Sequence, residues 1–178
     1  MRRPGAGAVA AMMRRLLPLV LLVLAACSGA APPSEVAITE ISGPMPALSG
    51  QALQGSTLSS ADYRGHVVVV NFWATWCGPC RREQPELNSV QATHDGVVFI
   101  GVNYRDDSAA ARAYLKELGV AYPSLSDPAG SLAYRFGVPY LPSTIIVDAT
   151  GRMRYRVVGA LDRTTLDDLL SKVGAPAS

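Results

Sequence analysis

The chain has 178 residues, a formal net charge of +2, three cysteines, 49% hydrophobic residues and 17% charged residues. These values exclude an intrinsically disordered chain and a disulfide-stapled miniprotein, and the length predicts a single domain with at most a tail. Because the number of cysteines is odd, at least one of them has a role other than pairing within this chain.

The positive charge is concentrated at the start of the chain. Residues 1–26 contain Arg2, Arg3, Arg14 and Arg15 and no acidic residue. The remaining residues carry 12 basic and 14 acidic side chains. Since no cluster of Lys and Arg interleaved with aromatic residues follows, the sequence argues against nucleic-acid binding.

Residues 1–26 are predicted to be a signal peptide. The apolar run 16–26 has 11 residues, whereas a membrane-spanning helix needs about 20, so the run fits the hydrophobic region of an export signal. It leads into Leu24-Ala25-Ala26-Cys27, which resembles the lipobox of bacterial lipoproteins. We therefore expect Cys27 to be lipidated and to anchor the chain on the extracytoplasmic side of a membrane. The alternative is a cleavable signal that happens to end at a cysteine.

Residues 27–45 are rich in Ala, Pro, Ser and Gly and are predicted to form a lipidated N-terminus and flexible linker. A folded domain is predicted over 46–174, followed by a tail at 175–178. The expected elements in chain order are a β-hairpin at 46–58, a strand at 67–73, a helix at 79–93 with a kink at Pro85, a strand at 97–102, a helix at 108–118 capped by Ser108, a short helix at 127–136, a strand at 144–147, an edge strand at 153–158 and a helix at 164–173. Strands that alternate with helices predict an α/β domain with a central sheet.

The residues that carry chemistry are Trp76-Cys77-Gly78-Pro79-Cys80, between a buried strand and a helix. A cysteine just before the first helical turn faces unpaired N–H groups, which stabilise a thiolate. Proline suits the first turn because a missing N–H group costs little there. Two cysteines at this spacing can close a small disulfide and exchange it in two steps, in which one attacks and the other resolves.

The segments LSSADYRGHVVVVNFWATWCGPCRREQPEL and FGVPYLPSTIIVDATGRM resemble the thioredoxin superfamily, and more narrowly its membrane-anchored TlpA/ResA-like thiol–disulfide oxidoreductases. The resemblance covers nearly all of 46–174 and implies a thioredoxin-like fold, a central mixed sheet flanked by helices. The longer stretch at about 106–125 matches the helix–strand insertion of this group.

The resemblance also implies the roles of individual residues. Cys77 is the attacking thiol, Cys80 is the resolving thiol and Pro142 is the cis-proline, whereas Pro139 is out of register. Further residues are expected to contact the substrate, namely Trp76, Gly78, Pro79 and the backbone of Leu141. No metal or cofactor is implied.

Two further positions distinguish the chain from cytoplasmic thioredoxins. Asn71 stands where those proteins carry a buried Asp that relays protons, and Asn cannot titrate. Glu83 follows Cys80 by three residues on the same helix face, and we infer that it tunes the thiols and moves the resolving proton. The alternative is a solvated Glu83 that only favours the helix dipole.

The predicted function is extracytoplasmic reduction of protein disulfides, for example in cytochrome c maturation. The expected partners are cysteine-containing proteins such as apocytochrome c and a transmembrane thiol carrier that supplies electrons. The main alternative is an oxidant in the folding of exported proteins. A copper metallochaperone and a peroxidase are less well supported, because the cysteine spacing and the residues before Cys77 do not match. His66 and His94 are expected to be structural or solvent-facing.

Overall fold

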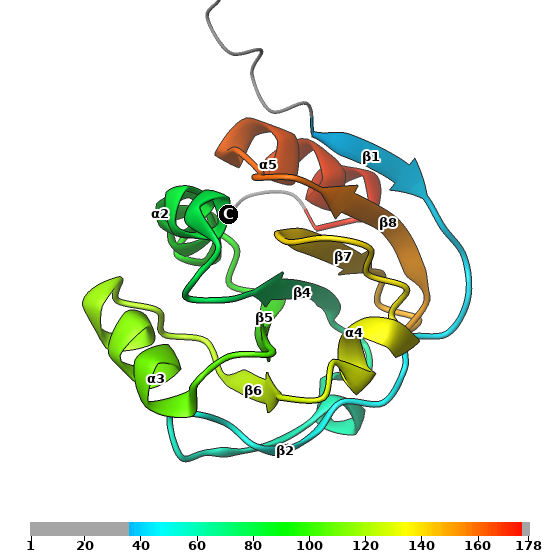
Figure 1. Ribbon diagram of the computed structural model, residues 1–178. Helices are drawn as coiled ribbons and strands as arrows, with labels where there is room; N and C mark the ends of the chain where they lie inside the picture. Colours follow the sequence, from blue (N-terminus) through cyan, green and yellow to red (C-terminus); the bar gives the residue numbers. More distant parts are fainter. Residues whose placement is uncertain (1–35, 176–178) are drawn as a thin grey trace, which may run out of the picture. The chain divides into compact units, whose positions relative to one another are not determined.

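The computed structural model describes residues 36–175 (Figure 1). The elements follow one another as strands β1 (Ala37–Glu40), β2 (Ser49–Gln51) and β3 (Thr57–Ser59), the 3-10 helix η1 (Ser60–Tyr63), strand β4 (Val67–Trp73), helix α2 (Gly78–Gln91), strand β5 (Val97–Tyr104), helix α3 (Ser108–Glu117), strand β6 (Ser124–Asp127), helix α4 (Ser131–Arg135), strands β7 (Ser143–Val147) and β8 (Met153–Val158), and helix α5 (Arg163–Lys172). Helix α2 continues through Pro85.

Six strands form one mixed sheet in the order β1-β8-β7-β4-β5-β6. Strand β4 is central: it runs parallel to β5 and antiparallel to β7. Its seven residues are all buried, as the continuous apolar run predicts for a strand covered on both faces. The sheet confirms the α/β class.

The two faces of the sheet carry separate cores. Residues that alternate along β4 point to opposite faces, so Val69 and Trp73 pack with α2, α3 and α5, whereas Val70 and Phe72 pack on the side of α4. Figure 1 shows α2 and α5 beside each other and α4 across the sheet. Both cysteines of the motif belong to the first core, which places the chemistry on the face of α2.

The folded region begins earlier than the sequence predicts. The flexible linker was expected to reach residue 45, but β1 pairs antiparallel with β8 in the register Ala37↔Val158 to Glu40↔Tyr155. All four residues of β1 are exposed. Because neither face of the strand is buried, its sequence AITE shows no alternation of apolar and polar residues that would reveal it. The same pairing makes the edge-strand prediction for 153–158 wrong, since β8 lies between β1 and β7. At the other end, Ala175, assigned to the tail, donates its N–H to the Leu170 carbonyl.

The short helix also starts later than predicted. Its expected first residue, Asp127, ends β6 instead, and its carboxylate accepts hydrogen bonds from the Ala133 N–H at 2.9 Å and the Ser131 hydroxyl at 3.3 Å. Gly130 has a φ of 75° and lies between the strand and the helix. This left-handed residue stops a helix from running back to 127.

The other predicted elements are present within a few residues of their expected ends. Strands β2 and β3 form the antiparallel hairpin ahead of β4, and α3 with β6 forms the expected helix–strand insertion. Helix α3 is capped by Asp107, whose side chain accepts from the Ala110 N–H, and not by Ser108.

Gly101 in the middle of β5 is required by close packing. A Cβ atom there would collide with Ser124 Oγ and lie 2.9 Å from Trp73 Nε1. We expect Gly101→Ala to lower the free energy of unfolding by about 1–3 kcal/mol, because overpacking of a buried site forces its neighbours apart. Urea denaturation measures this loss. The control is Gly96→Ala, where a Cβ would meet no atom within 4 Å. Equal stability of the two variants would contradict the prediction.

Candidate active site

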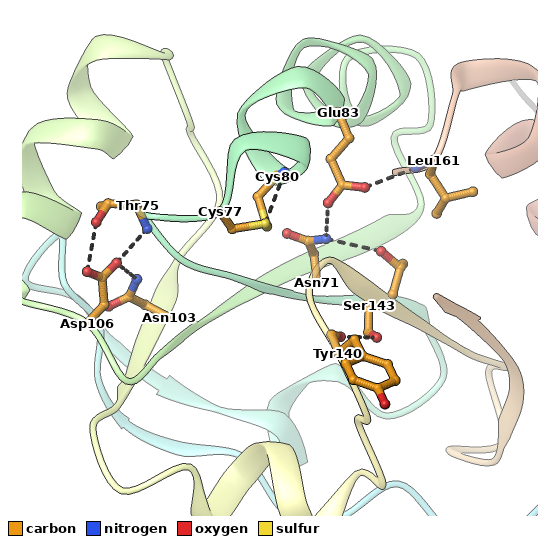
Figure 2. The surroundings of a disulfide bond; sticks show 11 residues. Asn71, Thr75, Cys77, Cys80, Glu83, Asn103, Asp106, Tyr140, Ser143 and Leu161 are labelled. Atoms are coloured by element: carbon orange, nitrogen blue, oxygen red, sulfur yellow. Dashed lines mark hydrogen bonds between the residues drawn. A yellow bond between two sulfur atoms is a disulfide. The ribbon is translucent and has the colours of Figure 1, made fainter. Parts of the chain in front are cut away.

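The two cysteines of the motif form a disulfide at the start of α2 (Figure 2). Cys77 is the N-cap residue of the helix, and its Sγ accepts a hydrogen bond from the Cys80 N–H at 3.2 Å. Cys77 is 5% exposed and Cys80 is 1% exposed, so Cys77 is the one that a partner reaches more readily. A sulfur held against helical N–H groups is stabilised as a thiolate once the disulfide is reduced.

The loop before β7 lies beside the motif. The Leu141–Pro142 peptide bond is cis, as predicted, and the Ser143 hydroxyl donates to the Tyr140 carbonyl at 2.7 Å. An open cleft of about 310 Å³ adjoins this loop, lined by Trp76, Tyr104, Val138, Pro139, Tyr140 and Leu141. Aromatic and aliphatic side chains therefore form the surface next to the disulfide.

The two tryptophans have opposite roles. Trp76 is 60% exposed, and its indole N–H donates to the Arg105 carbonyl at 3.3 Å. Trp73 is buried and stacks on Tyr114 with the ring centroids 4.6 Å apart. Trp73 is therefore part of the core between the sheet and α3, whereas Trp76 presents an aromatic surface to solvent.

Glu83 lies one helical turn after Cys80 and is only 2% exposed. Its Oε1 accepts from Asn71 Nδ2 at 2.8 Å, and its Oε2 accepts from the Leu161 N–H at 3.0 Å. Burial raises the pKa of Glu83 from its ordinary value to about 7, although the two hydrogen bonds oppose the shift. A carboxyl group with this pKa gains and loses a proton at neutral pH. The alternative of a solvated Glu83 is therefore wrong.

Sequence reasoning missed a second carboxylate, Asp106. It follows β5 and accepts hydrogen bonds from the Thr75 N–H at 2.6 Å, the Thr75 hydroxyl at 2.7 Å, Asn103 Nδ2 at 2.8 Å and the Asp107 N–H at 3.0 Å (Figure 2). Burial by itself would raise the pKa of Asp106, but these bonds outweigh it and hold the pKa below its ordinary value. Asp106 thus fixes the loop that leads into Cys77. The only sign of this role in the sequence was that Asp106 closely follows β5, the strand that pairs with β4 ahead of the motif.

We expect Asp106→Asn to lower the free energy of unfolding by about 1–3 kcal/mol, since an amide cannot accept all four bonds. Because the pKa of Asp106 is lowered by folding, its stabilisation is present at neutral pH and is lost as acid protonates the carboxylate. Urea denaturation at pH 7 and at pH 3 measures both effects. The exposed Asp95→Asn variant is the control, and the hypothesis fails if the two variants lose the same stability at pH 7.

The remaining charged candidates lie around this site or in the core. Arg81 pairs with Glu117 at 2.6 Å, and its guanidinium lies 4.9 Å from the centre of the Tyr114 ring. His94 is buried, with Nδ1 3.0 Å from the Val90 carbonyl, whereas His66 is exposed. Cys27 lies outside the described residues. Within 36–175 no helix is long and apolar enough to cross a membrane.

Comparison with known proteins agrees with this geometry. The thiol:disulfide interchange protein DsbE of Pseudomonas fluorescens biotype C is 40% identical over 141 residues, which cover 78% of each chain. The thiol-disulfide oxidoreductase ResA of Bacillus thuringiensis subsp. konkukian is 28% identical over 123 residues, 68% of this chain and 71% of ResA. The crystal structure of a DsbF homologue from Corynebacterium diphtheriae superposes with a TM-score of 0.69 at 28% identity, covering 80% of this chain and 96% of the other.

The fold and the site together define a thiol–disulfide oxidoreductase with a thioredoxin-like fold. The Redoxin family model matches residues 40–172, and the chain belongs to the Redoxin family. The TlpA/ResA-like resemblance is thereby confirmed.

Proposed function

We propose that this oxidoreductase works as a reductase of protein disulfides on the extracytoplasmic side of a membrane. The observation that carries the proposal is that, within residues 36–175, Cys77 Sγ accepts a hydrogen bond from the Cys80 N–H alone and none from a side chain. The two residues between the cysteines add no side-chain donor, because glycine has no side chain and the side chain of proline contains only carbon and hydrogen. A strong oxidant of this fold needs a strongly stabilised reduced form. The Gly78-Pro79 pair supplies no such stabilisation and so favours a reductant.

The reaction that we propose has two steps. The Cys77 thiolate attacks a sulfur of the substrate disulfide, which forms a mixed disulfide and releases one substrate thiolate. Cys80 then loses its proton and attacks Cys77 Sγ, which closes the Cys77–Cys80 disulfide and releases the second substrate thiolate. Both electrons pass to the substrate, and each released thiolate takes up a proton. Glu83 accepts the Cys80 proton, because it lies one turn away and titrates near neutral pH.

The proposed substrates are exported proteins with paired cysteines, such as apocytochrome c before haem attachment. The oxidised enzyme would then be reduced again by a transmembrane dithiol carrier. Cys27 would keep the domain near that carrier through its lipid anchor. This part of the proposal rests on the leader sequence and on the TlpA/ResA-like resemblance.

The reduction potential of the Cys77–Cys80 pair tests the direction of transfer. We expect a value near that of thioredoxin, about −270 mV, when the full chain is equilibrated with dithiol and disulfide mixtures. A potential above about −150 mV would overturn the reductase proposal and support the role in oxidative folding.

Trp76 is proposed to contact protein substrates. We expect Trp76→Ala to lower kcat/KM for a disulfide-containing protein about tenfold, the loss of an exposed aromatic anchor of about 1.4 kcal/mol. Turnover of oxidised glutathione, which is too small to use the cleft, should change less than about twofold. Tyr134→Ala is the matched control, because Tyr134 is 86% exposed and does not line the cleft. Equal losses with both substrates would contradict a contact role.

Leu141 is proposed to bind the substrate through its backbone. Within residues 36–175, neither its N–H nor its carbonyl takes part in a backbone hydrogen bond, although the next residue accepts one from the Gly159 N–H at 3.0 Å. An extended substrate segment could therefore pair with Leu141 beside the disulfide. Gly78 and Pro79 lie between the two cysteines in the chain and complete the proposed contact surface.

A further inference from the structure

One polar atom beside the disulfide has no partner. Asn71 is 1% exposed, and its Oδ1 is buried without a hydrogen bond. A buried acceptor without a donor is unusual in a folded protein, because it has lost its water and gained nothing in exchange. Because this oxygen lies in the active site, a group of the active site can be its donor in another state of the protein.

The position of Asn71 follows from strand β4. Val69 and Trp73 point to the face that holds both cysteines, and the residue between them, Asn71, shares that face because side chains alternate along a strand. The Asn71 side chain therefore lies beneath the first turns of α2. Figure 2 shows its amide between the disulfide and the Glu83 carboxylate, with the oxygen turned toward the disulfide.

The amide is held in this orientation by its nitrogen. Nδ2 donates to Glu83 Oε1 at 2.8 Å and to Thr144 Oγ1 at 3.1 Å. When Glu83 is ionised, as at pH 8, a flipped amide would place Oδ1 against a carboxylate oxygen, and two acceptors would repel each other. Glu83 is in turn fixed by the Leu161 N–H. The oxygen consequently remains on the side of the cysteines.

We propose that Asn71 Oδ1 accepts a hydrogen bond from the Cys80 thiol when the disulfide is reduced. Reduction breaks the S–S bond, and two electrons and two protons pass from an external dithiol, which becomes a disulfide. One of these protons stays on Cys80 Sγ as an S–H group. That group is the missing donor, since Cys80 is the more buried cysteine and lies on the helix whose Glu83 accepts a hydrogen bond from Asn71.

The consequence is that Asn71 shifts the redox equilibrium. In the oxidised protein Oδ1 has no partner, whereas in the reduced protein it has one, so Asn71 stabilises the dithiol relative to the disulfide. Asn71 is thus a positioning residue that adjusts how readily the enzyme releases electrons. The inference deepens the proposed function, because it relies on Cys80 being the inner, resolving thiol.

The first test measures the equilibrium between the full chain and dithiothreitol at pH 8, where Glu83 is ionised. We expect Asn71→Leu, which keeps the volume and removes the amide, to shift the equilibrium about tenfold toward the disulfide, or about 30 mV for two electrons. Thr144→Val is the matched control: it removes a partner of Nδ2 and leaves Oδ1 in place, so its equilibrium should change less than about twofold.

A double-variant cycle separates Asn71 from Glu83. If Asn71 acted only through its bond to Glu83, then Asn71→Leu would have no effect in a Glu83→Gln background. If Oδ1 acts on Cys80, the tenfold shift remains in that background. Absence of the shift in both backgrounds overturns the proposal.

The S–H stretching band provides a direct signature, and its decisive measurement keeps Asn71 in place, so that measurement does not depend on the folding of Asn71→Leu. In the reduced Cys27→Ser, Cys77→Ser protein only Cys80 contributes to the band. We expect the band at a lower wavenumber than that of a free thiol, and expect it to return to the free position in Asn71→Leu. A band at the free position in the protein with Asn71 intact overturns the proposal. These outcomes do not depend on the wild-type potential, so failure of the reductase proposal would be recognised separately.

Discussion

Replacement of Cys80 by serine is expected to stop turnover and to leave the substrate covalently attached to the enzyme. Cys77 can still attack a substrate disulfide, but no second thiol remains to resolve the mixed disulfide. We expect steady-state reduction of a protein disulfide to fall at least about a thousandfold, as it does when one member of a catalytic pair is removed. Non-reducing electrophoresis after a quench in acid detects the adduct, and dithiothreitol releases it.

Two variants complete this experiment. Cys77→Ser should lose turnover equally but form no adduct, because the thiol that a partner reaches first is absent. Cys27→Ser should turn over the same substrate at the wild-type rate in detergent solution. If Cys77→Ser forms the adduct and Cys80→Ser does not, the assignment of attacking and resolving thiols is reversed.

Replacement of Glu83 by glutamine is expected to remove a pH dependence from both stability and exchange. Folding raises the pKa of Glu83 from 4.5 to about 7, because the carboxyl is buried. The folded state therefore binds the proton more tightly than the unfolded state, and stability falls as the pH rises between these values. The loss is about 3 kcal/mol and is complete by about pH 8, at 1.36 kcal/mol per pKa unit.

Urea denaturation of the oxidised protein between pH 4.5 and pH 8 measures this loss. We expect wild type to lose about 3 kcal/mol relative to Glu83→Gln over that range. The rate of disulfide exchange should also lose its inflection near pH 7 in the variant, because no proton acceptor with that pKa remains beside Cys80. Glu86→Gln, on the same helix, is the control and should keep both profiles. Parallel stability curves for wild type and Glu83→Gln would exclude a raised pKa.

In the proposed mechanism, the resolving proton takes a different route here than in the cytoplasmic thioredoxins that the sequence resembles. The residue on the central strand is an amide, which holds its neighbours but cannot titrate. The titratable group comes instead from the helix and reaches the same place, as the 2.8 Å bond between the two side chains shows. In the proposed mechanism, the inner face of the active site is divided between Glu83, which moves a proton, and Asn71, which accepts a hydrogen bond.

Several features of this protein could be determined from the sequence alone. The buried run 67–73, the Cys-Gly-Pro-Cys motif after it and the helix that follows are encoded by residues close together in the chain. Apolar runs, helical spacing and capping act over one or two turns, so they are readable without a fold. The cis conformation at Pro142 was implied by the family resemblance, in which its position is set by the strand residues that directly follow it, and not by the local sequence itself.

The tertiary structure decided what depends on residues far apart in the chain. Strand β1 has no apolar pattern and exists because β8 offers it an edge, more than 100 residues later. The raised pKa of Glu83 depends on burial under the Leu161 loop, 78 residues away. Asp106 fixes Thr75 across 31 residues. Burial and long-range hydrogen bonds arise only when the sheet brings these segments together, so the sequence predicted the reactive cysteines, whereas the fold determined the groups that control them.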